Sequence, residues 1–152
     1  MASIRSTPAS EAWRALLVAF TSIRDELAED LLERADVRIE HYEILLMLYT
    51  AGDEGLRPSA IAEHRRLTRS GATRLIDRLV AKDIVDRREC GADGRGSVIV
   101  LADYGREIFM RAGQVHLEGI EQHVGSKLTA AEAQQLTELL TKLRDKPESS
   151  SA

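Results

Sequence analysis

One segment of this chain is patterned for β-structure, and helical patterns surround it on both sides. Residues 84–90 and the β-branched run 97–101 (SVIVL) have the composition of two short strands. The glycine-rich sequence GADGRG at residues 91–96 joins them. Two such strands form a hairpin, and the arginines along it and at its tip make it basic. The chain is therefore predicted to be mainly α with a small β-hairpin.

The helices are predicted from apolar residues spaced three and four apart and from capping residues at their starts. Ser10 is the expected cap of the first helix, Pro58 suits the first position of a short third one, and Thr68 is the expected cap of the fourth. Thr129-Ala-Ala-Glu132 fits a capping box for the last. The predicted helices cover residues 10–36, 39–51, 58–64, 68–82, 103–124 and 129–146. The element order is α-α-α-α-β-β-α-α.

The 152 residues are enough for one domain, and 43% of them are hydrophobic. The longest apolar runs are much shorter than the roughly 20 residues that span a bilayer, and the first residues do not have the pattern of a signal peptide. A single cysteine, Cys90, excludes an internal disulfide. We therefore expect a cytoplasmic protein with no membrane partner.

Basic residues are concentrated in the middle of the chain although the whole chain has a net charge of −4. Residues 57–95 contain nine arginines and one lysine against six acidic residues. The rest of the chain is strongly acidic. A concentration of positive charge in one segment predicts a polyanionic partner better than the total charge does.

A short helix, a tight turn, a second helix with a polar outer face and a basic hairpin together make a winged helix-turn-helix. The fourth predicted helix would bury Ala72, Leu75, Ile76, Leu79 and Val80 and turn its other face to the major groove of double-stranded DNA. Gly71 would let the backbone approach DNA closely. The residues expected to read or grip the major groove are Arg69, Ser70, Thr73, Arg74 and Arg78. Arg87 and Arg88 are expected to contact the DNA backbone, and Arg95 at the hairpin tip the minor groove.

The sequence resembles the MarR family of bacterial winged-helix regulators. The resemblance is carried by LTRSGATRLIDRLVAKDIVDRRE (67–89), by Asp93-Gly94-Arg95 in the wing and by the run 98–101, and it extends over residues 10–146. It implies a homodimer whose N- and C-terminal helices, 10–36 and 103–146, interlock around winged lobes of about residues 39–101. The apolar faces of the first and last helices favour the same conclusion. Residues 1–9 are then a flexible arm, and 147–152 a disordered tail.

The resemblance also implies a function. Members of the family usually repress, and two recognition helices read a pseudo-palindromic operator until a small molecule releases them. Candidate effector residues are Trp13, Arg14, His41 and Tyr42, since an aromatic ring beside a guanidinium and an imidazole would suit an aromatic or anionic effector of unknown identity. The alternative for Trp13 is the core of the dimer.

The turn departs from the family pattern. Arg65-Arg66 stands where relatives commonly have leucine and glycine, so Arg66 would have to adopt a positive φ at a cost of roughly 1 kcal/mol or more. Ala102 stands where a threonine usually caps the helix after the wing. The altered turn leaves one alternative from another class open, a winged-helix protein-interaction module without DNA binding.

Metal and redox sensing are weaker alternatives. Glu40, His41, His116 and His123 are the candidate metal ligands, but His116 and His123 are two helical turns apart and no second cysteine is present. Cys90 at the end of the first strand could sense oxidants if its pKa were depressed and its thiol accessible. Nucleotide-binding, metalloprotease and serine-hydrolase motifs are missing from the sequence. We therefore expect no enzyme activity, no cofactor and no metal.

Overall fold

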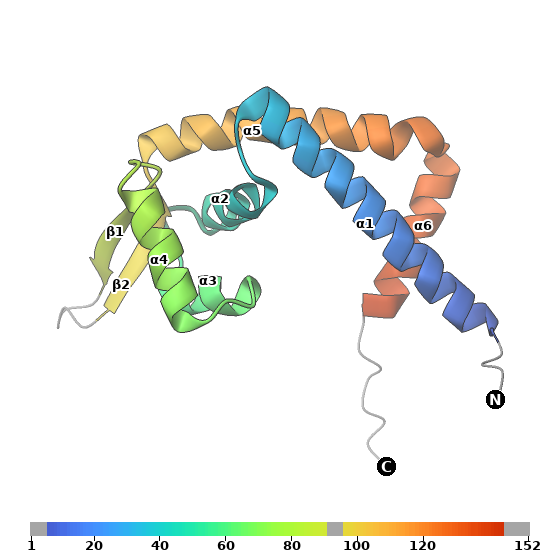
Figure 1. The fold of residues 1–152 in the computed structure, drawn as a ribbon, viewed down its shortest axis with the longest axis horizontal. Coiled ribbons are helices and arrows are strands. Elements are labelled where there is room, and N and C mark those ends of the chain that lie inside the picture. Colours follow the sequence, from blue (N-terminus) through green and yellow to red (C-terminus); the bar gives the residue numbers. More distant parts are fainter. Residues whose placement is uncertain (1–5, 91–95, 145–152) are drawn as a thin grey trace, which may run out of the picture. The chain divides into compact units, whose positions relative to one another are not determined.

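The computed structural model describes residues 6–90 and 96–144. The chain divides into two compact units, one formed by Ala28–His116 and the other by Met1–Leu27 together with Leu117–Ala152. The helices are α1 (Pro8–Ala35), α2 (Ile39–Ala51), α3 (Pro58–His64), α4 (Arg69–Val80), α5 (Asp103–His123) and α6 (Ala130–Arg144), with short 3-10 turns at Gly52–Glu54 and Gly125–Lys127. The strands are β1 (Val85–Cys90) and β2 (Gly96–Leu101). The predicted element order and the mainly helical class with a two-stranded wing are confirmed (Figure 1).

The first helix begins earlier than predicted. α1 starts at Pro8, and Thr7 is its cap: the Ser10 amide donates to Thr7 Oγ1 at 3.2 Å. The Thr7 amide donates in return to Ser10 Oγ at 2.8 Å. Assigning the cap to Ser10 was wrong because Pro8 suits the first helical position, where a missing N–H costs nothing. Ser10 instead completes a reciprocal pair of caps.

The core of the Ala28–His116 unit forms around the hairpin. β1 and β2 are antiparallel, with Val85 opposite Leu101 and Arg87 opposite Ile99. Leu56 extends the sheet by a single bridge, in which its amide and that of Ile99 exchange hydrogen bonds of 2.9 and 2.8 Å. Side chains from the sheet, α2, α3 and α4 are buried together in this unit. Those that are almost completely buried are Ile44, Leu45, Leu48, Ile61, Ala72, Ile76, Val85, Ile99 and Val100.

The start of α5 is fixed by a close backbone approach. The Ala102 amide donates to Ile84 O at 3.2 Å, which ties the beginning of α5 to the chain segment that follows α4. A Cβ added at Gly105 would lie 1.9 Å from the same carbonyl oxygen. Only glycine therefore permits this packing, and it sets where the hairpin ends and α5 begins.

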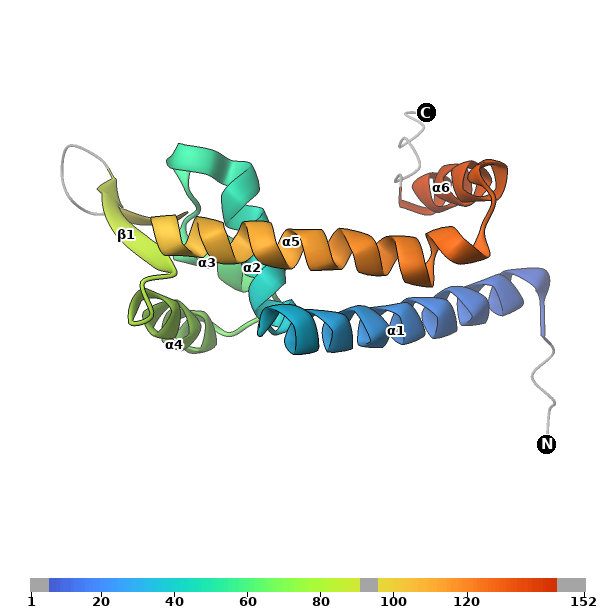
Figure 2. The same cartoon turned by 90° about the horizontal axis from the view of Figure 1, so that it is seen from above.

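The other unit exposes many apolar side chains. Trp13, Leu17, Val18 and Phe20 of α1 are exposed, as are Leu117 of α5 and four leucines of α6. Figure 2 shows α6 apart from α1. The predicted capping box opens α6, because the Thr129 amide donates to Glu132 Oε2 at 2.8 Å. This hydrogen bond and that of the Thr129 hydroxyl lower the pKa of the Glu132 carboxyl. None of the described helices is long and apolar enough to cross a membrane.

Two glycines of α5 predict opposite effects of the same substitution. Gly105→Ala places a methyl group against the Ile84 carbonyl and should destabilise the protein by about 2 kcal/mol or more, since overpacking is costly in a close-packed core. Gly113→Ala is the control, because the nearest atom to its Cβ, the Tyr42 hydroxyl, is 3.9 Å away. Alanine is a better helix former, so this variant should gain about 0.5–1 kcal/mol. Urea denaturation measures both, and equal stability of the two variants would contradict this packing.

Candidate nucleic-acid interface

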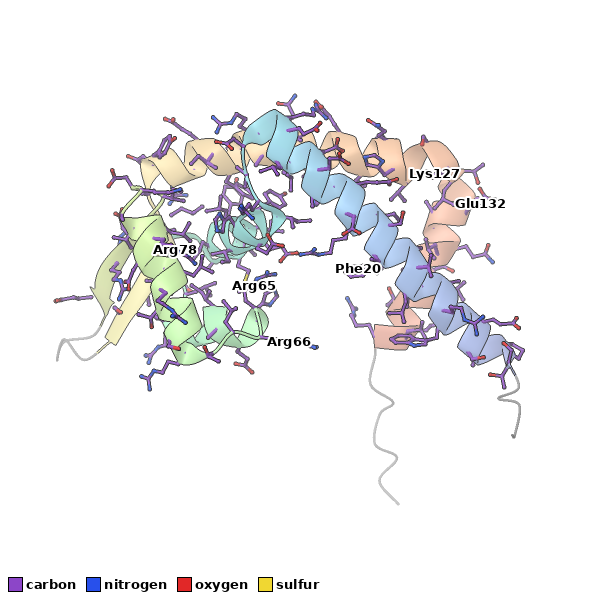
Figure 3. The ribbon with its side chains drawn as sticks, in the orientation of Figure 1. Phe20, Arg65, Arg66, Arg78, Lys127 and Glu132 are labelled. Carbon is purple, nitrogen blue, oxygen red and sulfur yellow. The ribbon has the colours of Figure 1, made fainter. Side chains whose placement is uncertain are left out.

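Helix α4 has one buried face and one exposed face. Ala72, Leu75, Ile76 and Leu79 are buried against the rest of the unit, as predicted, and Val80 is half-buried. The outer face is exposed and carries the predicted residues Arg69, Ser70, Thr73, Arg74 and Arg78. Figure 3 shows Arg78 on this face. Burial of a single stripe leaves three guanidinium groups directed toward solvent on one helix.

The start of α4 is capped as predicted. Thr68 has extended backbone angles, and its Oγ1 accepts a hydrogen bond of 3.1 Å from the Gly71 amide. A Cβ at Gly71 would lie 3.1 Å from that oxygen, so the glycine also gives room to the cap. The Thr73 hydroxyl donates to Arg69 O at 3.0 Å, which leaves its lone pairs available as acceptors. The capped end of α4 therefore presents backbone N–H groups and cationic side chains together.

A concave surface lies between α3, α4 and β2. Its lining combines two arginines, two hydroxyl side chains from α3 and β2, and Thr73, and comprises Arg57, Pro58, Ser59, Ala62, Arg69, Thr73, Gly96 and Ser97. Arg57 at the start of α3 was not among the predicted site residues. A basic residue directly before the first helix of a helix-turn-helix was the signal that could have identified it, since that helix crosses the DNA backbone.

Arg87 is paired within the unit. Its guanidinium donates to the Asp77 carboxylate of α4. Since Arg87 lies opposite the buried Ile99 in the sheet register, its side chain is on the face of the hairpin that packs toward α4. Arg88, the next residue, lies opposite Val98 and is exposed. Arg95 and Asp93 lie outside the described residues.

The turn between α3 and α4 contains the positive φ that the sequence predicted. Arg66 has φ 50°, and its amide donates to Glu63 O at 3.1 Å. The amides of Arg65 and Leu67 donate to Ile61 O and Ala62 O at 3.0 and 2.8 Å. Arg65 forms an ion pair with Glu43 of α2, whereas Arg66 is exposed. Figure 3 labels both arginines at this turn.

The four candidate effector residues belong to different units. Trp13 and Arg14 are exposed on the part of α1 that belongs to the Met1–Leu27 segment. His41 and Tyr42 belong to the other unit. Tyr42 is buried, with its ring centroid 5.8 Å from that of Phe109 and 4.7 Å from that of His116. Burial raises the pKa of the Tyr42 hydroxyl and lowers the pKa of His116.

His41 lines a cavity between α2, α4 and α5. Leu45, Leu79 and Ile108 form an apolar floor, and Lys82 and Arg111 add positive charge at the rim, where Asp36 and Tyr104 also lie. Burial lowers the pKa of His41, and the nearby charges of Lys82 and Arg78 lower it further. The field at His41 is therefore net positive despite the opposing effect of Glu40.

The candidate metal ligands are not grouped in the part of the chain that the structure describes, and redox sensing by Cys90 stays a prediction. Over residues 6–90 and 96–144, no three His, Cys, Asp or Glu side chains are grouped closely enough to hold an ion. His123 Nδ1 lies 3.1 Å from a carboxylate oxygen of Glu26, which joins α5 to α1. Cys90 ends β1 opposite Gly96.

Known proteins share both the sequence pattern and this fold. The model of the MarR family matches residues 35–96. An HTH-type transcriptional regulator from Bacillus cereus is 25% identical over 127 residues, which are 84% of this chain and 83% of the relative. Sco3205, a MarR family transcriptional regulator from Streptomyces coelicolor solved in complex with DNA, superposes with a TM-score of 0.77 at 26% identity, covering 96% of this chain and 97% of that one.

A third comparison extends the agreement. MarR from Escherichia coli in its apo form has a TM-score of 0.75 at 24% identity, over 91% of this chain and 98% of that chain, and supports the fold. The matched family is one of transcriptional regulators, in agreement with the expectation that the chain is not an enzyme. The capped α4, the wing beside it, the family match and these relatives lead to one conclusion: the chain is similar in sequence and fold to the MarR family of helix-turn-helix transcriptional regulators.

Proposed function

We propose that this regulator binds a pseudo-palindromic operator in double-stranded DNA as a homodimer, represses transcription there, and is released by a small-molecule effector. The observation that carries the DNA-binding part is the exposed face of α4, where Arg69, Arg74 and Arg78 accompany Ser70 and Thr73. The concave surface that Arg69 shares with Arg57 gives the phosphate backbone a place beside the groove-reading helix.

The charges of this lobe favour DNA over a protein partner. Asp77, the acidic residue on the outer face of α4, pairs with Arg87, so its negative charge is offset there. The remaining side chains of that face are cationic or small and polar. Sco3205 was solved in complex with DNA, and a crystal structure of an E. coli MarR variant contains operator DNA. We propose the same class of ligand for this chain, with Arg88 and Arg95 of the wing as further contacts.

A salt-dependent titration tests DNA binding. Fluorescence anisotropy with DNA from upstream of the chain's own gene should show tighter binding than with a scrambled duplex, and log K should fall linearly with log salt as phosphate contacts release counterions. Arg74→Ala should weaken binding by about 1–3 kcal/mol. Lys127→Ala removes one positive charge from the exposed turn Gly125–Lys127 and should change affinity less than twofold.

The result that would contradict this proposal is equally weak binding to both duplexes and to a genomic library of fragments, with no salt dependence. That outcome would favour the protein-interaction alternative. An equal loss of affinity in Arg74→Ala and Lys127→Ala would instead mean that α4 is not the interface.

The exposed apolar faces of α1 and α6 support the homodimer. Leu136, Leu139, Leu140 and Leu143 follow one another along α6 and are all exposed in a single chain. A monomer in water rarely exposes a contiguous apolar surface of this kind. A second copy presents the same faces, and a two-fold dimer covers both at once. Two α4 helices would then read half-sites about one helical turn of DNA apart.

One leucine of α6 provides a test of the dimer. Leu139 is 51% exposed, and Leu139→Glu would place a charge in the proposed interface, which should shift the protein from dimer to monomer at micromolar concentration. Leu46→Glu on α2 is the control, because Leu46 is 42% exposed but belongs to the other unit. Analytical ultracentrifugation distinguishes the species. A dimer that survives Leu139→Glu, or a wild-type monomer, would overturn the interface.

The cavity at His41 supports an anionic effector. An anion with an apolar body would contact Lys82 and Arg111 through its charge and Leu45, Leu79 and Ile108 through its body. Leu79 lies at the C-terminal end of α4 and Lys82 just beyond it, so a ligand in the cavity would contact the end of the recognition helix. Trp13 and Arg14 remain candidate effector residues from the sequence.

Benzoate serves as a probe of this cavity. A bound carboxylate stabilises the protonated imidazole, so benzoate should raise the pKa of His41 and weaken DNA binding. The neutral isostere benzamide should do neither, and Arg111→Met should weaken the benzoate effect. NMR titration of His41 measures the shift without DNA. An unchanged His41 pKa at saturating benzoate, or the same effect from benzamide, would exclude anion binding here.

A further inference from the structure

We infer that Glu43 and Arg65 are positioning residues, which hold the turn between α3 and α4 against α2 and thereby set the orientation of α4 on DNA. The inference deepens the proposed function and rests on it, since the orientation of α4 matters only to a protein that reads DNA. Neither residue need touch the nucleic acid.

The ion pair is half-buried and joins α2 to the turn that follows α3. The side chain of Arg65 is 19% exposed and that of Glu43 30% exposed, so both charges are partly withdrawn from water. Ile61 anchors the middle of α3 in the core, but Arg65 follows the last residue of that helix. The pair therefore fixes the end of α3 that leads into the turn.

The backbone transmits this restraint to α4. The amides of Arg65, Arg66 and Leu67 all donate back into α3, so the turn is rigid up to Leu67. Thr68 then caps α4 immediately. Arg66 occupies the left-handed region, which is unfavourable for any residue other than glycine. A turn with an intrinsic preference for other conformations needs an outside contact to keep it, and the bond from Arg65 to Glu43 is that contact.

Another role for Arg65 predicts the opposite result. If Arg65 were a phosphate contact and Glu43 only competed with DNA for it, removing the Glu43 charge would free the guanidinium and tighten DNA binding. If the pair positions the turn, removing either charge breaks the link between α2 and the turn and loosens the turn. The sign of the effect of Glu43→Gln therefore separates the two roles.

The experiment is a double-mutant cycle on operator affinity. We expect Glu43→Gln and Arg65→Gln each to lower specific affinity about fivefold or more, the double variant to be no weaker than either single one, and the salt dependence to keep its wild-type slope. Glu63→Gln is the matched control: it removes the same charge from an exposed position on α3 and should leave affinity unchanged within twofold or raise it slightly. Tighter binding by Glu43→Gln, additive losses, or a lower salt slope in Arg65→Gln would overturn the inference.

A second measurement does not require DNA. Hydrogen exchange of the Leu67 amide, which donates to Ala62 O, should accelerate at least fivefold in Glu43→Gln and in Arg65→Gln but not in Glu63→Gln. If the wild-type protein bound no DNA, the proposed function would fail. The exchange rate of the Leu67 amide would still show whether the ion pair restrains the turn. An unchanged exchange rate of the Leu67 amide in both variants would show that the ion pair does not restrain the turn, whether or not the protein binds DNA.

Discussion

The structure of the winged lobe depends on burial of one stripe of α4. Ala72, Leu75, Ile76 and Leu79 pack into the unit formed by the hairpin, α2 and α3, and this packing decides which residues face outward. Hydrophobic burial is strong but not directional, so it fixes the face of the helix more firmly than the angle at which the helix lies. The angle has to come from contacts with defined geometry.

Two ion pairs and one close backbone approach provide such contacts. Asp77 with Arg87 ties the middle of α4 to β1, and Glu43 with Arg65 ties the turn before α4 to α2. Gly105 brings the start of α5 against the Ile84 carbonyl just beyond the other end of α4. Arginine suits these pairs because its planar group binds a carboxylate with a defined orientation. The arginines of the winged lobe therefore fall into two groups: Arg65 and Arg87 hold the lobe together, and Arg69, Arg74 and Arg78 are exposed on α4.

The sequence predicted the helices and strands far better than the ion pairs between them. Periodicity and caps placed α2 and α3 at their observed bounds and identified Thr68 and the Thr129–Glu132 box, because these signals are local. The positive φ of Arg66 was predicted because Arg66 stands where relatives commonly have glycine. The partners of Arg65 and Arg87 could not be predicted, since they join residues on different elements and depend on tertiary packing. Arg57 was not predicted as a site residue because the concave surface that it lines exists only once α3, α4 and β2 come together.

Hydrogen exchange of the full chain, with and without DNA from upstream of its own gene, would locate the surface that binds DNA. A DNA-binding α4 predicts slower exchange from Thr68 to Arg78 and in β2, with α6 unchanged. Specific DNA binding that slows exchange in α1 or α6 and leaves the exchange rate of α4 unchanged would contradict a DNA-binding α4.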